Sequence, residues 1–327
     1  MSSLKDKHIG VLMGGISEER EISLRTGEAI YAALKKQGYL VSKIIVDRDV
    51  DVTLRKTTID MAFIALHGTY GEDGCIQGLL ELRGIPYTGS GVLASALCMN
   101  KAKSKELFRL HNIPTAPYYL VRRDQLASYK KLHEDFAFPV FVKPNNQGSS
   151  VGGSRAQTLE ELKESLELAA KFDHEILVER FVPGREVTIG VLHGKALGAI
   201  EIEPKREFYD YKAKYEAGQS EYHFPARLSQ EHYDSVLALA EKANACLGVT
   251  GVSRVDTLVT EGGNTYVLEV NTMPGMTSES SLVPKIAAGL GFSFEELCVA
   301  ILEGIPLAKA QQSKAQTKVS PAAVATL

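Results

Sequence analysis

Hydrophobic and polar positions in the first hundred residues alternate between short apolar runs and longer amphipathic stretches. Three apolar runs predict buried strands, at residues 8–13, 40–46 and 61–66. Two amphipathic stretches predict helices, at residues 18–37 and 76–82, and Ser17 is expected to cap the first. This alternation predicts a parallel sheet flanked by helices. Ligands gather where such strands end, which here is at Gly14-Gly15 and His67-Gly68.

The rest of the chain predicts two more units built from strands and helices. Predicted strands lie at residues 139–144, 175–180, 186–192, 196–203, 252–259 and 265–271. Predicted helices lie at residues 92–98, 102–111, 161–171, 229–247, 282–290 and 294–303. Pro114 and Pro117 mark a linker, and the Ala-, Gln-, Ser- and Lys-rich tail is expected to be frayed.

The last two predicted strands flank Glu261-Gly-Gly-Asn264, a strong turn signal, and are expected to form a hairpin. With the turn centred on its two glycines, Asp256 faces Glu269 and Arg254 faces Asn271 across the ladder. Two carboxylates in opposite positions repel each other, and a hairpin shaped for stability alone would avoid that pairing. The sequence therefore contains a local conflict that needs a physical reason.

An oxygen-binding divalent cation would remove this repulsion. Two carboxylates and an amide oxygen suit magnesium that is shared with substrate phosphates. The competing interpretation is a solvated outer face that tolerates the like-charge pair. The irregular loop over residues 273–281, which is rich in backbone donors, favours a binding site over a plain surface.

Composition and charge narrow the classes of function. The chain has 327 residues, enough for two or three domains, and its 44% hydrophobic content is ordinary for a globular protein. A net charge of −3 gives no reason to expect nucleic acid or an anionic membrane as a partner. The four cysteines form no CxxC pair and fit a reducing compartment. With no recognisable signal peptide or membrane span, we expect a soluble, cytoplasmic protein.

Candidate nucleotide chemistry lies in the middle of the chain. Residues 145–152 follow the strand that carries Lys143 and are suited to fold backbone N–H groups over phosphates, although a flexible turn is the alternative. Glu179 and Glu186 are placed to accept hydrogen bonds from a nucleotide's amino group and ribose hydroxyls; taken alone, each would be a surface carboxylate. Residues 208–218 mix aromatic side chains with lysines and predict a lid over an anionic ligand. Neither GxxxxGK[ST] nor GxGxxG occurs, so a Walker A loop and a dinucleotide site are not predicted.

Six motifs stand in a known order over residues 10–285. They are Gly14-Gly-Ile-Ser-Glu-Glu-Arg-Glu-Ile-Ser-Leu24, Leu66-His-Gly-Thr-Tyr-Gly-Glu-Asp-Gly74, Tyr87-Thr-Gly-Ser-Gly91, Val142-Lys-Pro144 with Gly148-Ser-Ser-Val-Gly152, Tyr209-Asp-Tyr211 with Lys214-Tyr215, and Arg254-Val-Asp256 with Glu269-Val-Asn-Thr-Met-Pro-Gly275. In these motifs the chain resembles the D-alanine–D-alanine ligases of the ATP-grasp superfamily. The resemblance implies a mixed α/β chain with a three-domain ATP-grasp architecture and a Rossmann-like N-terminal parallel sheet.

The resemblance also implies boundaries and a reaction. The expected parts are a Rossmann-like domain at 1–100, a central ATP-grasp domain at 101–185, a catalytic domain at 186–310 with a lid at 206–220, and a flexible tail at 311–327. The reaction would use ATP to phosphorylate one D-alanine, after which the amine of a second D-alanine attacks the acyl phosphate to make D-alanyl-D-alanine for peptidoglycan. The expected cofactor is magnesium, as two ions that manganese can replace, and the expected assembly is a homodimer through the first domain.

The resemblance assigns a role to each matched residue. Phosphates would be held by Lys101, Lys143, Ser149 and Lys214. Metal ions would be bound by Asp256, Glu269 and Asn271. Adenosine would be seated by Glu179, Val182 and Glu186. The first D-alanine and the closed lid would depend on Glu19, His67, Ser149 and Tyr215. The oxyanion would be stabilised by Arg254 and the Gly275 N–H. The second substrate's carboxylate would be held by Ser281 and Leu282.

One position departs from the family pattern, and several alternatives stay open. Asn100 stands where the family usually has Asp before the phosphate lysine. Tyr215 matches the dipeptide-forming type, so we expect an amino acid rather than D-lactate as second substrate. The alternatives are another ATP-grasp ligase with a different amino acid specificity and a nucleotide-binding regulator without turnover. A dinucleotide-binding oxidoreductase is disfavoured because its glycine fingerprint is missing.

Overall fold

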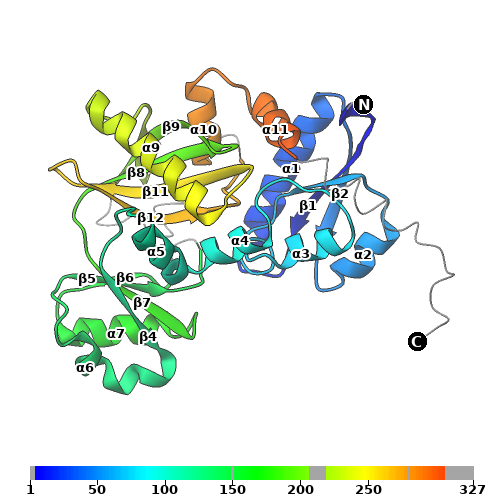
Figure 1. The fold of residues 1–327 in the computed structure, drawn as a ribbon. Helices are drawn as coiled ribbons and strands as arrows, with labels where there is room; N and C mark the ends of the chain where they lie inside the picture. The colour runs from blue at the N-terminus through cyan, green and yellow to red at the C-terminus, as the bar shows by residue number, and fades with distance from the viewer. Residues whose placement is uncertain (1–3, 149–150, 206–218, 278–279, 306–327) are drawn as a thin grey trace, which may run out of the picture.

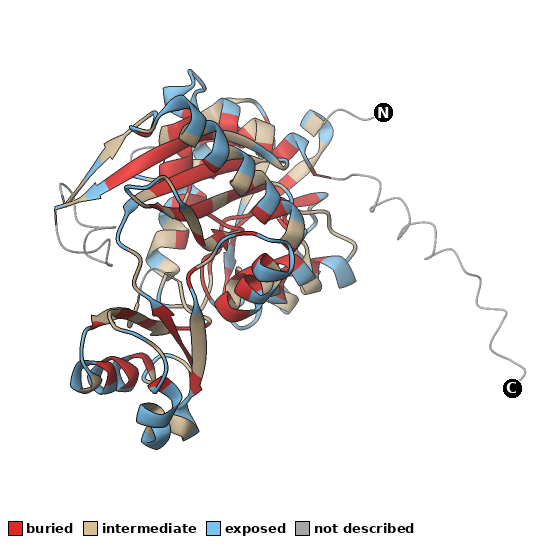
Figure 2. Cartoon of the chain, turned by 60° about the vertical axis from the view of Figure 1, so that its left-hand side comes forward, coloured by how far each residue is buried: buried red, intermediate tan, exposed pale blue. Residues whose placement is uncertain are grey.

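Three sheets organise the described residues of the computed structural model, which are 4–148, 151–205, 219–277 and 280–305. One sheet is parallel and two are antiparallel. Figure 1 shows the antiparallel sheet that contains β4, β5, β6 and β7 set apart from the other two. Buried residues, red in Figure 2, concentrate in the strands and on the inner faces of the helices. The predicted mixed α/β class is confirmed.

The first unit is built on a three-stranded parallel sheet. β1 (His8–Gly14) lies between β2 (Leu40–Val46) and β3 (Met61–Ile64). Alternate residues of β1 enter two cores: Val11 and Met13 pack with α1 (Arg20–Lys36), and Leu12 packs with α2 (Val50–Lys56) and α3 (Cys75–Leu82). Burial on both faces explains why the strand is an unbroken apolar run.

The start of α1 differs from the prediction. The helix begins at Arg20 with Glu19 at its N-cap position, and Ser17 does not cap it. Instead Ser17 Oγ donates to the His67 carbonyl (2.7 Å) and accepts the Glu19 N–H (3.2 Å). Ser17 therefore joins the two loops at the ends of β1 and β3, where the sequence predicts that ligands gather.

The middle unit is an antiparallel sheet covered by a helix. Its strands, in spatial order, are β4 (Tyr118–Arg122), β7 (Glu175–Arg180), β5 (Val140–Pro144) and β6 (Ser154–Ala156). α7 (Leu159–Ala169) packs Leu162 and Leu166 against Val142 and its neighbours, and Thr158 caps this helix by accepting the Glu161 N–H (3.2 Å). The short α6 (Tyr129–His133) lies in the same unit. The sequence did not predict β4 or β6, because both are short and only partly apolar.

The third unit is a five-stranded antiparallel sheet. Its strands, in spatial order, are β10 (Ser220–His223), β9 (Lys195–Pro204), β8 (Arg185–Leu192), β11 (Val252–Val259) and β12 (Thr265–Asn271). α9 (Gln230–Leu247) packs Val236 and Ala240 against this sheet. Its first turn is capped by Ser229, whose Oγ accepts the His232 N–H (3.3 Å).

The β11–β12 hairpin has the predicted register where the carboxylates lie. Asp256 pairs with Glu269 and Arg254 with Asn271. Beyond them the register shifts, because Thr257 pairs with Val267 and Leu268 is left over as a bulge. A bulge re-aims side chains, and here it lets Leu268 and Glu269 both line the same cavity while Val267 and Val270 stay in the core.

Helices cross between the units. α5 (Lys101–Leu110), which follows α4 (Val92–Met99), buries Phe108 in the core of the third unit. After α10 (Leu282–Gly289), α11 (Phe294–Glu303) returns to the first unit, where Leu297 and Ile301 pack in the core that contains Val11. By contrast, the core of the middle unit is formed by residues of that unit alone.

Some expectations fall outside the described residues. These are the tail at 311–327 and most of the lid expected at 206–220. In the remaining segments, no helix is long and apolar enough to cross a membrane.

A backbone contact joins the first and third units. The Thr250 N–H donates to Ser90 Oγ (3.1 Å), and Ser90 Oγ donates to the Thr250 carbonyl (3.1 Å). Next to them, Gly251 has a φ of +71°, and a Cβ there would lie 2.8 Å from Gly89 Cα. Only glycine allows this approach of the two backbones.

We therefore expect Gly251→Ala to lower the free energy of unfolding by about 3 kcal/mol or more, through positive φ and backbone overlap together. Gly248→Ala is the matched control, because Gly248 has a φ of +68° with nothing within 4 Å of the added Cβ. The control should cost only about 1 kcal/mol. Chemical denaturation of both variants measures the difference, and equal losses would contradict the contact's importance.

Candidate active site

The β11–β12 hairpin forms the floor of the site. Arg254 Nη2 lies 2.7 Å from Asp256 Oδ2, and Arg254 Nε lies 2.9 Å from Asp256 Oδ1. Thr188 Oγ1, on the neighbouring β8, donates to Asp256 Oδ1 (2.7 Å). On the opposite strand, Glu269 Oε2 pairs with Lys101 Nζ at 3.1 Å. Each carboxylate thus has a nearby cation, which offsets the repulsion that the register imposes.

Two cavities, of 220 and 420 Å³, meet at this hairpin. Both are lined by Lys101, Gln147, Asp256 and Glu269. A chemical group transferred from a ligand in one cavity to a ligand in the other would stay next to these four residues throughout. The shared wall therefore defines the place where chemistry between two ligands would occur.

The larger cavity lies between the two antiparallel sheets. Its apolar lining includes Phe141, Phe181, Val182, Leu258 and Leu268. Its charged lining includes Lys143, Glu179 and Glu186, from β5, β7 and β8. An apolar slot with charged groups at its edges suits a planar base with a phosphate tail.

Glu179 is a buried anion between two lysines. Its Oε1 lies 2.6 Å from Lys143 Nζ, and its Oε2 lies 2.9 Å from Lys105 Nζ. Burial alone would raise the pKa of Glu179, but the positive charges of Lys105 and Lys143 outweigh it and lower the pKa to about 2. The carboxylate is therefore ionised throughout the physiological pH range.

The smaller cavity lies between the first unit and the hairpin. Its lining includes Glu19, His67, Glu72, Arg254, Asn271, Gly275, Ser281 and Leu282. Carboxylates face it from the first unit, and a guanidinium faces it from the third. A cavity with both signs of charge suits a small zwitterion.

His67 is fixed in the wall of this cavity. Its Nδ1 lies 3.1 Å from Glu72 Oε1, and its Nε2 lies 3.2 Å from Thr26 Oγ1. Burial lowers the pKa of His67, but Glu72 and Glu19 outweigh that effect and raise it. Burial also raises the pKa of Glu72, so the pair holds a proton between two buried groups.

The structure brings most of the predicted site residues together around the two cavities. Ser149, Lys214 and Tyr215 lie outside the described residues. All the other predicted site residues line one cavity or both. Asn100, the departure from the family pattern, caps α5 by accepting the Lys103 N–H at Oδ1 (2.9 Å) and so fixes the helix start that carries Lys101.

Three residues with contacts to the site were missed by sequence reasoning. Glu72 stands in the same polar loop as His67. Thr188 shares a strand face with Glu186. Lys105 stands four residues after Lys101, one turn along the same face of α5, and this spacing was the available signal.

The hairpin residues fit a hard divalent cation. Asp256, Glu269 and Asn271 offer only oxygen donors, and the two carboxylates border both cavities. Oxygen-only sets of this kind suit magnesium or manganese.

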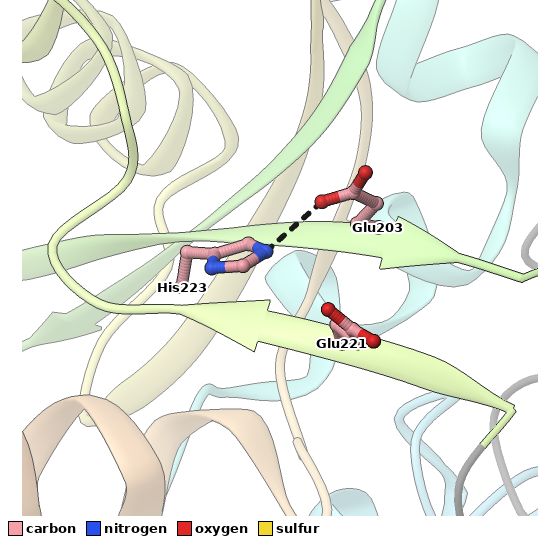
Figure 3. A group of neighbouring side chains, drawn as sticks. All are labelled: Glu203, Glu221 and His223. Atoms are coloured by element: carbon pink, nitrogen blue, oxygen red, sulfur yellow. Dashed lines mark hydrogen bonds and ion pairs between the residues drawn. The ribbon is translucent and has the colours of Figure 1, made fainter.

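A second group of potential ligands lies on β9 and β10, where Glu203, Glu221 and His223 come together (Figure 3). His223 Nε2 lies 3.0 Å from Glu203 Oε2, and Arg227 Nη2 lies 2.7 Å from the same oxygen. Glu221 Oε1 lies 3.7 Å from Lys205 Nζ. These basic neighbours account for the cluster as an ion-pair network, and we assign no metal to it.

Two antiparallel sheets that enclose a charged slot, with an acidic hairpin at its floor and a parallel-sheet unit beside it, define an ATP-grasp ligase architecture. The family model "D-ala D-ala ligase C-terminus" matches residues 107–303, and "D-ala D-ala ligase N-terminus" matches residues 49–90. The chain therefore belongs to the D-alanine–D-alanine ligase family.

Individual relatives agree with this assignment. The chain is 53% identical over 307 residues to the D-alanine–D-alanine ligase of Geotalea uraniireducens, covering 94% of this chain and 98% of that one. It is 54% identical over 300 residues to that of Geobacter sulfurreducens, covering 91% and 94%. Its structure is similar to the D-alanine–D-alanine ligase of Bacillus anthracis, with a TM-score of 0.82, 36% identity and coverage of 95% and 99%. It is also similar to the VanG D-Ala:D-Ser ligase of Enterococcus faecalis, with a TM-score of 0.80, 30% identity and coverage of 91% and 98%.

The hydrogen bond from Thr188 fixes one oxygen of Asp256, so we expect Thr188→Val to weaken divalent-cation binding by about tenfold to a hundredfold. Binding of Mn²⁺ in the presence of ADP, followed by electron paramagnetic resonance, measures the effect. Thr257→Val is the control, because Thr257 is buried on the same hairpin but donates to the Val187 carbonyl (2.7 Å). Equal Mn²⁺ affinities in the two variants would contradict the role of Thr188.

Proposed function

We propose that the two cavities hold ATP and two D-alanines, and that their shared wall is where the phosphoryl group is transferred. As a member of its family, the chain is an ATP-dependent D-alanine–D-alanine ligase that supplies D-alanyl-D-alanine for peptidoglycan precursors. The observation that carries the proposal is that Lys101, Asp256 and Glu269 border both cavities.

In the larger cavity, Val182 and the apolar walls take the adenine. Glu179 accepts a hydrogen bond from its 6-amino group, and Glu186 accepts from the ribose hydroxyls. Lys143 and Lys101 then lie along the path of the phosphates toward the hairpin. Ser149 and Lys214, by sequence, add contacts to the phosphates. Phosphoryl transfer needs such positioning and charge neutralisation more than covalent help from the protein.

Asp256, Glu269 and Asn271 would hold magnesium, and we propose two ions, with manganese as a substitute. When bound, the cations neutralise phosphate charge and orient the γ-phosphate. Arg254, which pairs with Asp256 in this structure, also lines the smaller cavity.

In the smaller cavity, Glu19 binds the ammonium of the first D-alanine, and His67 forms the wall beside it. The first carboxylate attacks the γ-phosphate, which releases ADP and gives a D-alanyl phosphate. The amine of the second D-alanine, held at its carboxylate by Ser281 and the Leu282 backbone, then attacks the acyl carbon. Arg254 and the Gly275 N–H stabilise the oxyanion before phosphate leaves. Ser149 and Tyr215, by sequence, close the site together with Glu19.

The experiment is phosphate release by the purified protein with ATP, magnesium and D-alanine, with the product identified by mass spectrometry. L-alanine and no-substrate reactions are controls, and D-lactate and D-serine test the second-substrate specificity. We expect release that depends on D-alanine, a D-alanyl-D-alanine product, and little use of D-lactate near neutral pH. Absence of D-alanine-dependent phosphate release by folded protein that binds ATP would favour a nucleotide-binding regulator without turnover instead.

Glu269→Gln should lower kcat by about a hundredfold or more, because a charge that faces both ligands is lost. Glu261→Gln, an exposed carboxylate in the turn of the same hairpin, is the matched control and should retain full activity. Steady-state kinetics of both variants separate these outcomes. Comparable activity in the two variants would refute the metal-site assignment.

We also propose that the domains follow the boundaries 1–100, 101–185 and 186–310, although α5 packs in the core of the third unit and α11 in that of the first. We propose that the enzyme works in the cytoplasm, where its substrate ATP is made. A homodimer through the first domain is supported by exposed apolar side chains there, at Leu40, Ile45, Leu82 and Leu93. Light scattering should give twice the monomer mass of 35.6 kDa. A mass of one chain at micromolar concentration would contradict the dimer.

A further inference from the structure

Lys105 is a fully buried lysine that lines neither cavity described above. Its side chain is 0% exposed on α5. Its Nζ donates to Thr115 Oγ1 (2.6 Å), lies 2.9 Å from Glu179 Oε2, and lies 5.8 Å from the centre of the Tyr118 ring. A buried ammonium is costly unless it is paired, so these contacts must offset a large desolvation penalty.

The environment of Lys105 is fixed by the backbone of the hairpin. Thr115, which accepts the hydrogen bond from Lys105, donates in turn to the Val267 carbonyl on β12 (2.8 Å). The ammonium is therefore held by one residue of β7 and, through Thr115, by the strand that carries Glu269. It cannot move toward a ligand without breaking both contacts.

The two lysines of Glu179 differ in what they face. Lys143 lines the larger cavity and pairs with Oε1, whereas Lys105 lies behind the carboxylate and pairs with Oε2. If phosphates enter the cavity, they compete with Glu179 for the ammonium of Lys143. Glu179 would then be a buried anion with only the second lysine as counter-charge.

Resting on the proposed function, which places ATP in this cavity, we propose that Lys105 is a positioning residue for the nucleotide. It pairs permanently with Glu179 from behind, so that Lys143 can turn to the phosphates while Glu179 stays aimed at the 6-amino group of adenine. Lys105 itself touches no substrate. Without it, Glu179 would hold Lys143, and the base and the phosphates would compete for the same pair of side chains.

Equilibrium binding tests this separately from turnover. Calorimetry would compare ADP with purine riboside diphosphate, which lacks the 6-amino group, on the full chain. The unaltered protein should bind ADP at least about tenfold more tightly, the ratio expected for one hydrogen bond to a charged group. Lys105→Met should weaken ADP binding by about tenfold and bring the ratio of the two dissociation constants near one.

Lys103→Met is the matched control, because Lys103 is an exposed lysine on the same helix that pairs with Glu106. It should leave both dissociation constants unchanged. If Lys105→Met does not fold, Lys105→Gln removes the charge while keeping a donor for Thr115, and should lower the ratio in the same direction.

A preserved ratio in the Lys105 variants, whether or not overall affinity falls, would mean a structural lysine and overturn the proposal. A ratio near one in the unaltered protein would overturn it as well, because Glu179 would not read the base. Failure of the proposed function would be detected by a different assay, as absence of D-alanine-dependent phosphate release.

Discussion

The site depends on one electrostatic constraint: two carboxylates stand opposite each other on neighbouring strands. Asp256 and Glu269 share a register position, and each is compensated by a different cation, Arg254 on one side and Lys101 on the other. Such an arrangement is poor for stability but well suited to bind more positive charge. The Leu268 bulge completes it, because it turns the apolar wall and the acidic floor toward the same space.

Helix α5 supplies counter-charges to carboxylates in two walls of the larger cavity. Lys101, at its first residue, pairs with Glu269, and Lys105, one turn later, pairs with Glu179. The same helix buries Phe108 in the core of the third unit. The placement of charge in the cavity is therefore tied to hydrophobic packing, and the two lysines keep a fixed separation whatever the middle unit does.

Much of the fold and of the candidate site was predictable, because these features depend on local sequence patterns. The parallel sheet followed from buried apolar runs. The pairings of Asp256 with Glu269 and Arg254 with Asn271 were predicted correctly, but the register predicted next to the turn was wrong by one residue, because Val259 pairs with Thr265. The bulge was not predictable, because the turn alone suggests one register for the whole ladder. Nor were the contacts of Thr188 and Lys105 to Asp256 and Glu179, since each joins residues about 70 positions apart in sequence that only the packed sheets bring together. Ser17 resembled a helix cap, but the helix begins three residues later, and the Ser17 hydroxyl donates to the His67 carbonyl of another loop.

The return of α11 to the first unit affects the order in which the chain can fold as it is synthesised. β1 is made before the other described strands, yet one of its two cores includes Leu297, Ile301 and Leu302, which are made after all of those strands. The middle unit, whose core is contiguous in sequence, can close as soon as its own residues have emerged. The core that contains Val11 is thus completed after that of the middle unit, and until α11 is made Val11 and Met13 lack that part of their packing.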